Sequence, residues 1–484
     1  MGKMDIESSP ADSGNDDSSN PDTKSNKSNE KSYNGVDIQA APTATVKVTN
    51  ALGGEGGKNF RNMSKWDCVF ALLTNQVGLG VLSLPGVLKV LGIVPGIIAI
   101  IGIGCLSWYT AFELKQFYGK HQHVLNVVDM CKVVGGRPLE IVAGVGLLIQ
   151  VIMTAASASV TLSIAFNTIS SHSLCTVGFI GIGCLCCWVL CMPRTAKFVA
   201  WSGIPCCISI ISAALLVMIS LGVTSPSGAP QGWKRQLAVV GNPTFREGLN
   251  ACLKIVYAYS GNINFVGYMA EMVDPVNDFN FALGILEITS ISFYVLVGVV
   301  IYCLAGEFTV SPALGSAVQT TAKIAYGIAL PAVLSTGLAF GHTGIKYVYV
   351  EIMQGIGASH QMTKNSTKSW SVWMISVTVF WVLCFILSNA IPVFDSILSI
   401  ASATTISWFT FGFSAVFWLN LNQGKYFSNW KKISLFIVNV FLILISLFMN
   451  GAGLWSSITE LLDIFESDSS SVQGVFSCGN NALF

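Results

Sequence analysis

The chain has 484 residues, of which 52% are hydrophobic and only 11% are charged, and its formal net charge is +1. An ordinary soluble domain carries about a quarter charged residues, so a single soluble core cannot hide this much apolar surface. The basic residues are scattered over short segments and form no continuous stripe, which argues against a nucleic-acid partner. The composition therefore predicts a protein whose solvent is the lipid bilayer.

Residues 1–59 differ in composition from the rest of the chain. They are rich in Ser, Asn, Asp, Lys and Gly, and they contain no apolar run long enough for the core of a signal peptide. We expect a disordered cytoplasmic tail, either a solvated extension without chemistry or a segment with a role in trafficking or phosphorylation.

Apolar runs long enough to cross the bilayer as helices, about 20 residues each, recur through the remainder of the chain. Polar residues, Pro and Gly divide this part into eleven predicted spans. In chain order they are 66–91, 93–117, 138–169, 176–192, 198–222, 248–270, 279–305, 321–352, 370–390, 393–418 and 433–455. We therefore expect an all-α membrane protein with a transmembrane domain at 60–456 and a C-terminal tail at 457–484.

Lys and Arg residues near the span ends predict the orientation. One set of flanks carries fourteen of them and the opposite set carries five. Because cytoplasmic loops are enriched in Lys and Arg, we expect a cytoplasmic N-terminus and, after eleven crossings, an extracellular C-terminal tail. The sequons at Asn26, Asn62 and Asn365 then lie on the cytoplasmic side, so glycosylation is not expected.

Fourteen cysteines could suggest a metal or redox site. Most lie inside apolar spans, where a thiol behaves as a small hydrophobe, and the cluster between Cys184 and Cys207 has no His or carboxylate to complete a ligand set. We expect neither a metal nor a cofactor. Cys175 and Cys478 both fall on the expected extracellular side, where a disulfide between them is possible but is not settled by the sequence.

Two spans are interrupted at bilayer depth. Residues 74–85 (TNQVGLGVLSLP) place two glycines, several polar side chains and a proline in the first span, and residues 257–264 (YAYSGNIN) interrupt the sixth. Irregular backbone is tolerated there only where it lines a cavity or is covered by protein. Breaks at corresponding places in two halves of a chain are typical of a transporter site, although tight helix packing is an alternative explanation.

Residues 75–85 (NQVGLGVLSLP), together with EMVDP at 271–275, resemble the amino acid/auxin permease family. Within it the chain is most similar to fungal neutral amino acid permeases of the methyltryptophan-resistance type. The resemblance extends over residues 59–455. It implies a leucine-transporter-like (APC) fold, with a 5+5 inverted repeat plus one extra helix. It also implies import of neutral, aliphatic or aromatic, amino acids at the plasma membrane.

The resemblance also implies where the substrate binds. The carboxylate would be held by backbone N–H groups around Gly78, Leu79 and Gly80, and the ammonium group would face carbonyls near Tyr259, Ser260 and Gly261. The expected substrate-binding set is completed by Thr74, Asn75, Asn262, Thr154 and Ser157. The last two lie on one helical face with Gln150 and Thr161, which indicates an aqueous path or, alternatively, hydrogen bonding to a neighbouring helix.

Four residues are candidates for the coupling ion. By the resemblance, Ser335 and Thr336 lie on the helix of the cation site, but Thr74 stands where sodium-coupled relatives commonly carry Asn, so we expect proton coupling. Glu287 lies deep in the seventh span and is either a proton carrier or a carboxylate paired with a neighbour. His342 is either a proton carrier or a structural hydrogen bonder.

Other functions remain open from the sequence. A vacuolar or vesicular amino acid exporter or exchanger, or a nutrient sensor that does not transport, would have the same fold. An intramembrane enzyme is not expected, because no Ser-His-Asp set, HExxH motif or pair of aspartates stands out in the spans. The expected partners are a neutral amino acid, a proton and the lipid bilayer.

Overall fold

The computed structural model describes residues 63–194, 196–230, 232–362, 366–466 and 474–482. The expected disordered tail at 1–59 lies outside them. The helices are α2 (Lys65–Gln76), η1 (Leu79–Ser83), α3 (Leu84–Leu91), α4 (Ile93–Lys120), α5 (Val127–Ser170), α6 (Thr176–Leu190), α7 (Ala196–Val223), α8 (Phe245–Ala258), α9 (Asn262–Glu271), α10 (Pro275–Ala305), α11 (Gln319–Gly355), α12 (Thr367–Ala390), α13 (Phe394–Ala401), α14 (Phe413–Leu421), α15 (Trp430–Phe448) and α16 (Leu454–Glu466).

The described part of the chain is helical, and its β pairing is a single bridge between Met63 and Met272. Within the same residues, nine helices are long and apolar enough to cross a membrane. The other two expected spans correspond to α6, an apolar helix of 15 residues, and to the pair α8 and α9, which the break at 259–261 divides into two short helices.

Two predicted boundaries differ from the structure. The expected third span begins at Pro138, but α5 starts earlier and turns at Gly136, whose φ of 65° is readily adopted by glycine. The last helix was expected to end near residue 455 but continues through α16 to Glu466. It continues because α16 packs against α8 and α13, with Ser457 and Leu461 buried.

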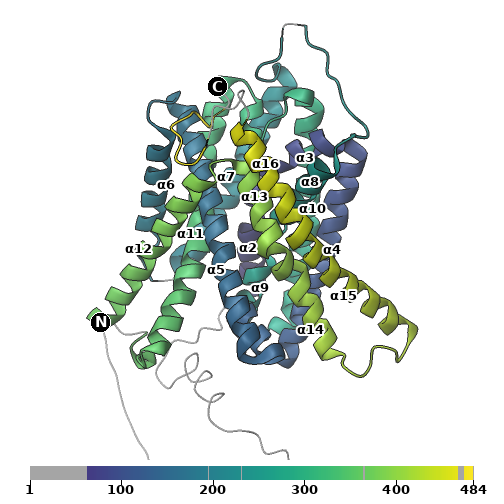
Figure 1. Ribbon diagram of the computed structural model, residues 1–484, viewed down its shortest axis with the longest axis vertical. Helices are drawn as coiled ribbons and strands as arrows, with labels where there is room; N and C mark the ends of the chain where they lie inside the picture. The colour runs from purple at the N-terminus through teal and green to yellow at the C-terminus, as the bar shows by residue number, and fades with distance from the viewer. Residues whose placement is uncertain (1–62, 195, 231, 363–365, 467–473, 483–484) are drawn as a thin grey trace, which may run out of the picture. The chain divides into compact units, whose positions relative to one another are not determined.

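Helix α11 packs along both α5 and α7 in the interior of the bundle (Figure 1). Glycines in α11 allow α5, α6 and α12 to approach it closely. A Cβ on Gly337 would lie 2.8 Å from the sulfur of Cys187 in α6, and one on Gly344 would lie 2.7 Å from both the Phe380 ring of α12 and the Val151 side chain of α5. Small residues commonly let membrane helices approach in this way, and Cys187 is one of several buried cysteines that fill this interior.

Loops far apart in the sequence meet at the same ends of the bundle. Gly241 donates its N–H to the Leu91 carbonyl, and the Trp233 indole donates to Glu307. At the other end, the Met63 N–H bonds the Glu271 carbonyl. The connections after the first, fifth and seventh spans therefore lie at one end of the bundle. The start of the first span lies at the other end, together with the connection after the sixth span.

A disulfide between Cys175 and Cys478 ties the C-terminal tail to the start of α6. The tail is also held by polar contacts. The Thr176 hydroxyl donates to the Gly479 carbonyl at 2.7 Å, and the Asn481 amide donates to Ser163 of α5 at 2.8 Å. The pairing that the sequence left open is therefore formed.

Candidate functional site

The first broken helix changes direction between α2 and η1. The helix α2 ends at Gln76, and Val77 and Gly78 have non-helical backbone angles before η1 begins at Leu79. No side chain caps η1, so its first N–H groups have no partner within the helix. Such a helix start can bind an anion, as expected around Leu79 and Gly80, whereas the Gly78 N–H donates to the Gln76 carbonyl.

The second broken helix lies directly against the first. Gly80 packs so closely on α8 that a Cβ there would lie 2.6 Å from the Cα of Ala258. The Asn75 amide donates to the Gly261 carbonyl at 3.0 Å, and its oxygen accepts from Asn264 at 2.7 Å. Asn75 therefore joins the two breaks, and one of the expected ammonium-binding carbonyls, that of Gly261, already accepts its hydrogen bond.

One tyrosine of α10 bridges the two breaks. The Tyr294 hydroxyl lies 2.7 Å from the Gln76 carbonyl and 2.9 Å from the Ala258 carbonyl. Each carbonyl belongs to the last turn of a helix that stops at its break, where intrahelical donors are missing. The Tyr294 ring also packs edge-on against Tyr259. We did not predict Tyr294 as a site residue.

Glu287 lies beside these residues on the same face of α10. It is fully buried. Its carboxyl oxygens lie 3.4 Å from the amide nitrogen of Gln76 and 3.5 Å from the hydroxyl of Ser107. Within the described part of the chain no ion pair involves Glu287. A membrane-buried carboxyl without a cation is costly when ionised, and such groups are functional by default.

The polar face of α5 reaches the second break. The Ser157 hydroxyl lies 2.7 Å from the Tyr257 hydroxyl in the last turn of α8. Thr154, one turn earlier, donates to the carbonyl of Gln150. The expected substrate residues of the third span therefore meet α8 just before the backbone breaks, beside Ser260, which is also buried.

Of the two expected cation-site residues, Thr336 lies near the first break and Ser335 contacts α7. The Thr336 hydroxyl oxygen is the nearest atom to a Cβ built on Gly78, at 3.3 Å. Ser335 is buried and bonds the thiol of Cys206 in α7. Thr336 therefore faces the break between α2 and η1.

Three expected site residues point elsewhere. The Thr74 hydroxyl donates to the Phe70 carbonyl and faces α7, where it lies 3.7 Å from the sulfur of Cys207. The Asn262 amide donates to Thr110 of α4 and to a carbonyl of the tenth span. His342 packs its ring 5.4 Å from Trp373 of α12. Thr74 and Asn262 therefore bond to their own helix or to neighbouring helices, whereas Asn262 Oδ1 and His342 Nε2 have no hydrogen-bond partner in the described part of the chain.

A second buried carboxyl was missed from the sequence. Glu113 of α4 is 1% exposed and lies beside Tyr109 and Asn439 of α15, whose side chains bond each other at 2.8 Å. Glu113 lies close to the end of its predicted span, so its position in the sequence did not indicate a deeply buried carboxyl. A better signal for the site itself was the helical spacing of Glu287, Ser290 and Tyr294 inside an apolar run.

An ion pair links α8 to α13. The Lys254 ammonium lies 2.7 Å from Asp395, whose other oxygen accepts from Ser311. The Lys254 side chain is 11% exposed. Although Lys254 lies near one end of the sixth predicted span, its side chain is mostly buried, because α13 covers this turn of α8 and supplies the counter-ion.

The family model described as transmembrane amino acid transporter protein matches residues 61–459. The chain belongs to this family. Family members transport amino acids, and the family expected from residues 75–85 is confirmed. The chain is 28% identical over 433 residues to the "N amino acid transport system protein" of Neurospora crassa, which covers 88% of this chain and 90% of the relative.

A second fungal relative is similar over almost its whole length. The chain is 27% identical over 458 residues to a "Transmembrane transporter" of Fusarium pseudograminearum, with 93% of both chains covered. The matched part includes both broken helices and α10. This amino acid transporter is therefore similar to its fungal relatives across the region that forms the candidate site.

Proposed function

We propose that this amino acid transporter is a proton-coupled symporter that imports neutral amino acids across the plasma membrane by alternating access. The observation that carries the proposal is the meeting of the two broken helices beside a fully buried carboxyl. Gly80 lies against Ala258, and Gln76 connects the first break to Glu287. Discontinuous helices that meet at mid-membrane are typical of transporter substrate sites.

The two breaks offer complementary groups to an amino acid. The uncapped start of η1 at Leu79 offers N–H groups to a carboxylate. The carbonyls near Tyr259 and Ser260 suit an ammonium group. These groups would bind the carboxylate and the ammonium that all amino acids share, and a neutral side chain is proposed because residues 75–85 resemble neutral amino acid permeases. The printed name of the Neurospora relative supports an amino acid as the cargo.

The proposed fold has eleven crossings and a 5+5 inverted repeat plus one helix. The loop contacts at each end of the bundle support this count, because each groups connections that alternate crossings would bring to one side. The excess of Lys and Arg on one set of flanks supports a cytoplasmic N-terminus and an extracellular C-terminal tail.

Uptake measurements test this function. The full-length protein is expressed in a permease-deficient yeast, and uptake of a panel of radiolabelled amino acids is measured at several pH values, with and without a protonophore. We expect uptake of neutral amino acids that rises as the external pH falls and that persists when choline replaces sodium. An absolute sodium requirement, or location in the vacuole with no uptake at the cell surface, would contradict the proposal.

A further inference from the structure

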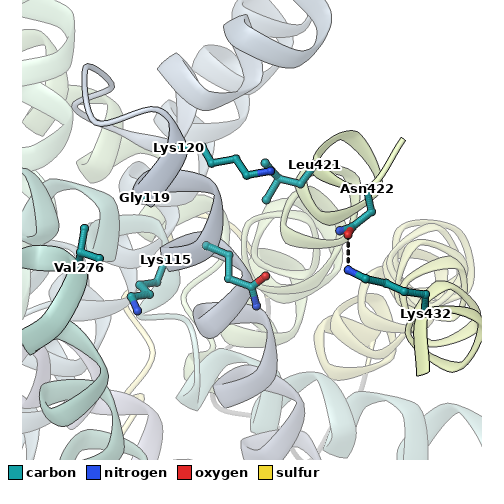
Figure 2. A pocket seen from close by; sticks show the side chains of 8 residues that line it. Lys115, Gly119, Lys120, Val276, Leu421, Asn422 and Lys432 are labelled. Carbon is teal, nitrogen blue, oxygen red and sulfur yellow. Dashed lines mark hydrogen bonds between the residues drawn. The ribbon is translucent and has the colours of Figure 1, made fainter. Parts of the chain in front are cut away.

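A basic cavity of about 390 Å³ lies at one end of the bundle, outside the proposed substrate site. It is formed where the end of α4 approaches the start of α10, the end of α14 and the start of α15. Its lining residues are Lys115, Gln116, Gly119, Lys120, Val276, Leu421, Asn422 and Lys432. Figure 2 shows Lys120 and Lys432 extending from different walls of this cavity. No carboxylate is among the lining residues.

The lysine of α15 is held in place. The Lys432 ammonium donates to the side-chain oxygen of Asn422 and lies 5.4 Å from the centre of the Trp418 ring. Asn422 is itself fixed, because its amide donates to the Trp418 carbonyl at 2.9 Å. An ordered ammonium loses less conformational freedom when it binds an anion than a mobile surface lysine does. This part of the cavity is therefore built before any ligand arrives.

The surroundings of the cavity are those of a membrane surface. Trp430 and Phe427, which come shortly before Lys432 in the sequence, are 79% and 72% exposed, and Phe112 of α4 is 40% exposed. Trp is enriched where a membrane protein meets the headgroups, so Trp430 indicates this level of the bilayer. The helix ends that form the cavity belong to the Lys- and Arg-rich side, where anionic lipids concentrate. An anion bound here would thus lie at headgroup level.

We propose that this cavity binds the phosphate-bearing headgroup of an anionic phospholipid, of the phosphoinositide class. Lys120 and Lys432 would flank a phosphomonoester, which carries about −1.5 to −2 charges, and Lys115, whose ammonium lies over the Phe112 ring, would add positive charge at the wall of the cavity. The acyl chains would lie along the apolar outer surface near Phe112. Basic pockets between membrane helices are suited to such headgroups. This site is independent of the amino acid cargo and of proton coupling.

Thermal unfolding of the purified full-length protein in detergent tests the proposal. The probes are dioctanoyl phosphatidylinositol 4-phosphate, dioctanoyl phosphatidylcholine and the soluble headgroup inositol 1,4-bisphosphate. A ligand that binds the folded state raises the unfolding midpoint. We expect the phosphoinositide alone to raise it. An equal effect of phosphatidylcholine, or of the soluble headgroup at the same concentration, would overturn the lipid assignment in favour of a chain effect or a free phosphate site.

A matched pair of variants locates the site. Lys115→Gln/Lys432→Gln removes two lining charges, and Lys368→Gln/Lys431→Gln removes two charges at the same end that do not line the cavity. We expect the first variant to need at least tenfold more phosphoinositide for the same midpoint shift, and the second to match the unmodified protein. An equal loss of the midpoint shift in both variants would overturn the proposal, because it would mean that the lipid binds only through the general positive charge of this surface.

Photocrosslinking of the unmodified protein keeps the test decisive if the first variant does not fold. A photoreactive phosphatidylinositol 4-phosphate is crosslinked to the full-length protein, and the labelled peptides are identified by mass spectrometry. We expect labelling within residues 112–120 and 418–436. Labelling confined to other segments would overturn the proposal.

Discussion

Gly78 and Gly80, two residues apart in the first break, have different neighbours. A Cβ on Gly78 would meet only the Thr336 hydroxyl, at 3.3 Å, whereas a Cβ on Gly80 would overlap the backbone of Ala258 at 2.6 Å. The contact at Gly78 can be relieved by a small movement of one side chain. The contact at Gly80 can be relieved only if η1 and α8 separate.

The first prediction compares Gly80→Ala with Gly78→Ala. Gly80→Ala should destabilise the protein by about 1–3 kcal/mol, because overpacking two helices costs that much, and should lower its unfolding temperature in detergent. Gly78→Ala should keep the unfolding temperature and instead weaken uptake by crowding the expected carboxylate site. Unfolding temperatures and uptake of both variants are measured together. A Gly80→Ala protein as stable as the original would contradict the packing argument.

The second prediction concerns Glu287→Gln. The neutral amide should keep the contacts to Gln76 and Ser107 while it removes the exchangeable proton. In liposomes, this variant should still exchange amino acid across the membrane but should lose accumulation driven by a proton gradient. Glu113→Gln is the control, because Glu113 is equally buried but contacts α15 rather than either break. Accumulation retained by Glu287→Gln would remove Glu287 from the coupling mechanism.

The third prediction, at the scale of helices, concerns the ion pair between α8 and α13. Removing one partner of a largely buried pair leaves an uncompensated charge, which typically costs about 3–5 kcal/mol. Lys254→Met should therefore lower the unfolding temperature strongly, and Asp395→Asn in the same chain should restore part of the loss. Thermal unfolding of the single and double variants measures this. Equal stability of Lys254→Met and the original protein would show that Asp395 is solvated without Lys254.

Some elements of the site could be predicted from the sequence and others could not. The breaks at 74–85 and 257–264 were predictable because Gly, Pro and amides interrupt apolar runs. The contact between Gln76 and Glu287 was not, because these residues are 211 positions apart and meet only when α2 packs on α10. The burial of Lys254 depends on α13 in the same way.

The helix type within the tenth span could not be predicted from the sequence either. The sequence predicts a span at 393–418, and the structure has one helical span there, Phe394–Leu421. Two π-helical segments that the sequence did not predict, Ser402–Ile406 and Trp408–Gly412, lie within it between α13 and α14. One of their carbonyls, that of Thr410, accepts a hydrogen bond from Asn262. A π-turn arises from packing against neighbouring helices and leaves no regular pattern in the sequence, although such turns are frequent at functional sites.

The fourth prediction concerns the topology of the whole molecule and uses the disulfide between Cys175 and Cys478. If the C-terminal tail is extracellular, a membrane-impermeant reductant applied to intact cells should open this bond. A membrane-impermeant maleimide should then label Cys478, and a Cys478→Ser variant should show a smaller labelling increase. Labelling that requires permeabilised cells would place the tail in the cytoplasm and would reverse the proposed orientation.

The central claim is that the broken helices and Glu287 form a proton-coupled amino acid site, and net transport by the purified protein tests it most directly. Full-length protein is reconstituted in sodium-free liposomes, a proton gradient is imposed with the acidic side outside, and entry of a labelled neutral amino acid is followed over time. We predict accumulation above the external concentration that collapses when a protonophore is added. Accumulation that is unchanged by the protonophore, or entry that never exceeds the external concentration although exchange is active, would contradict the account.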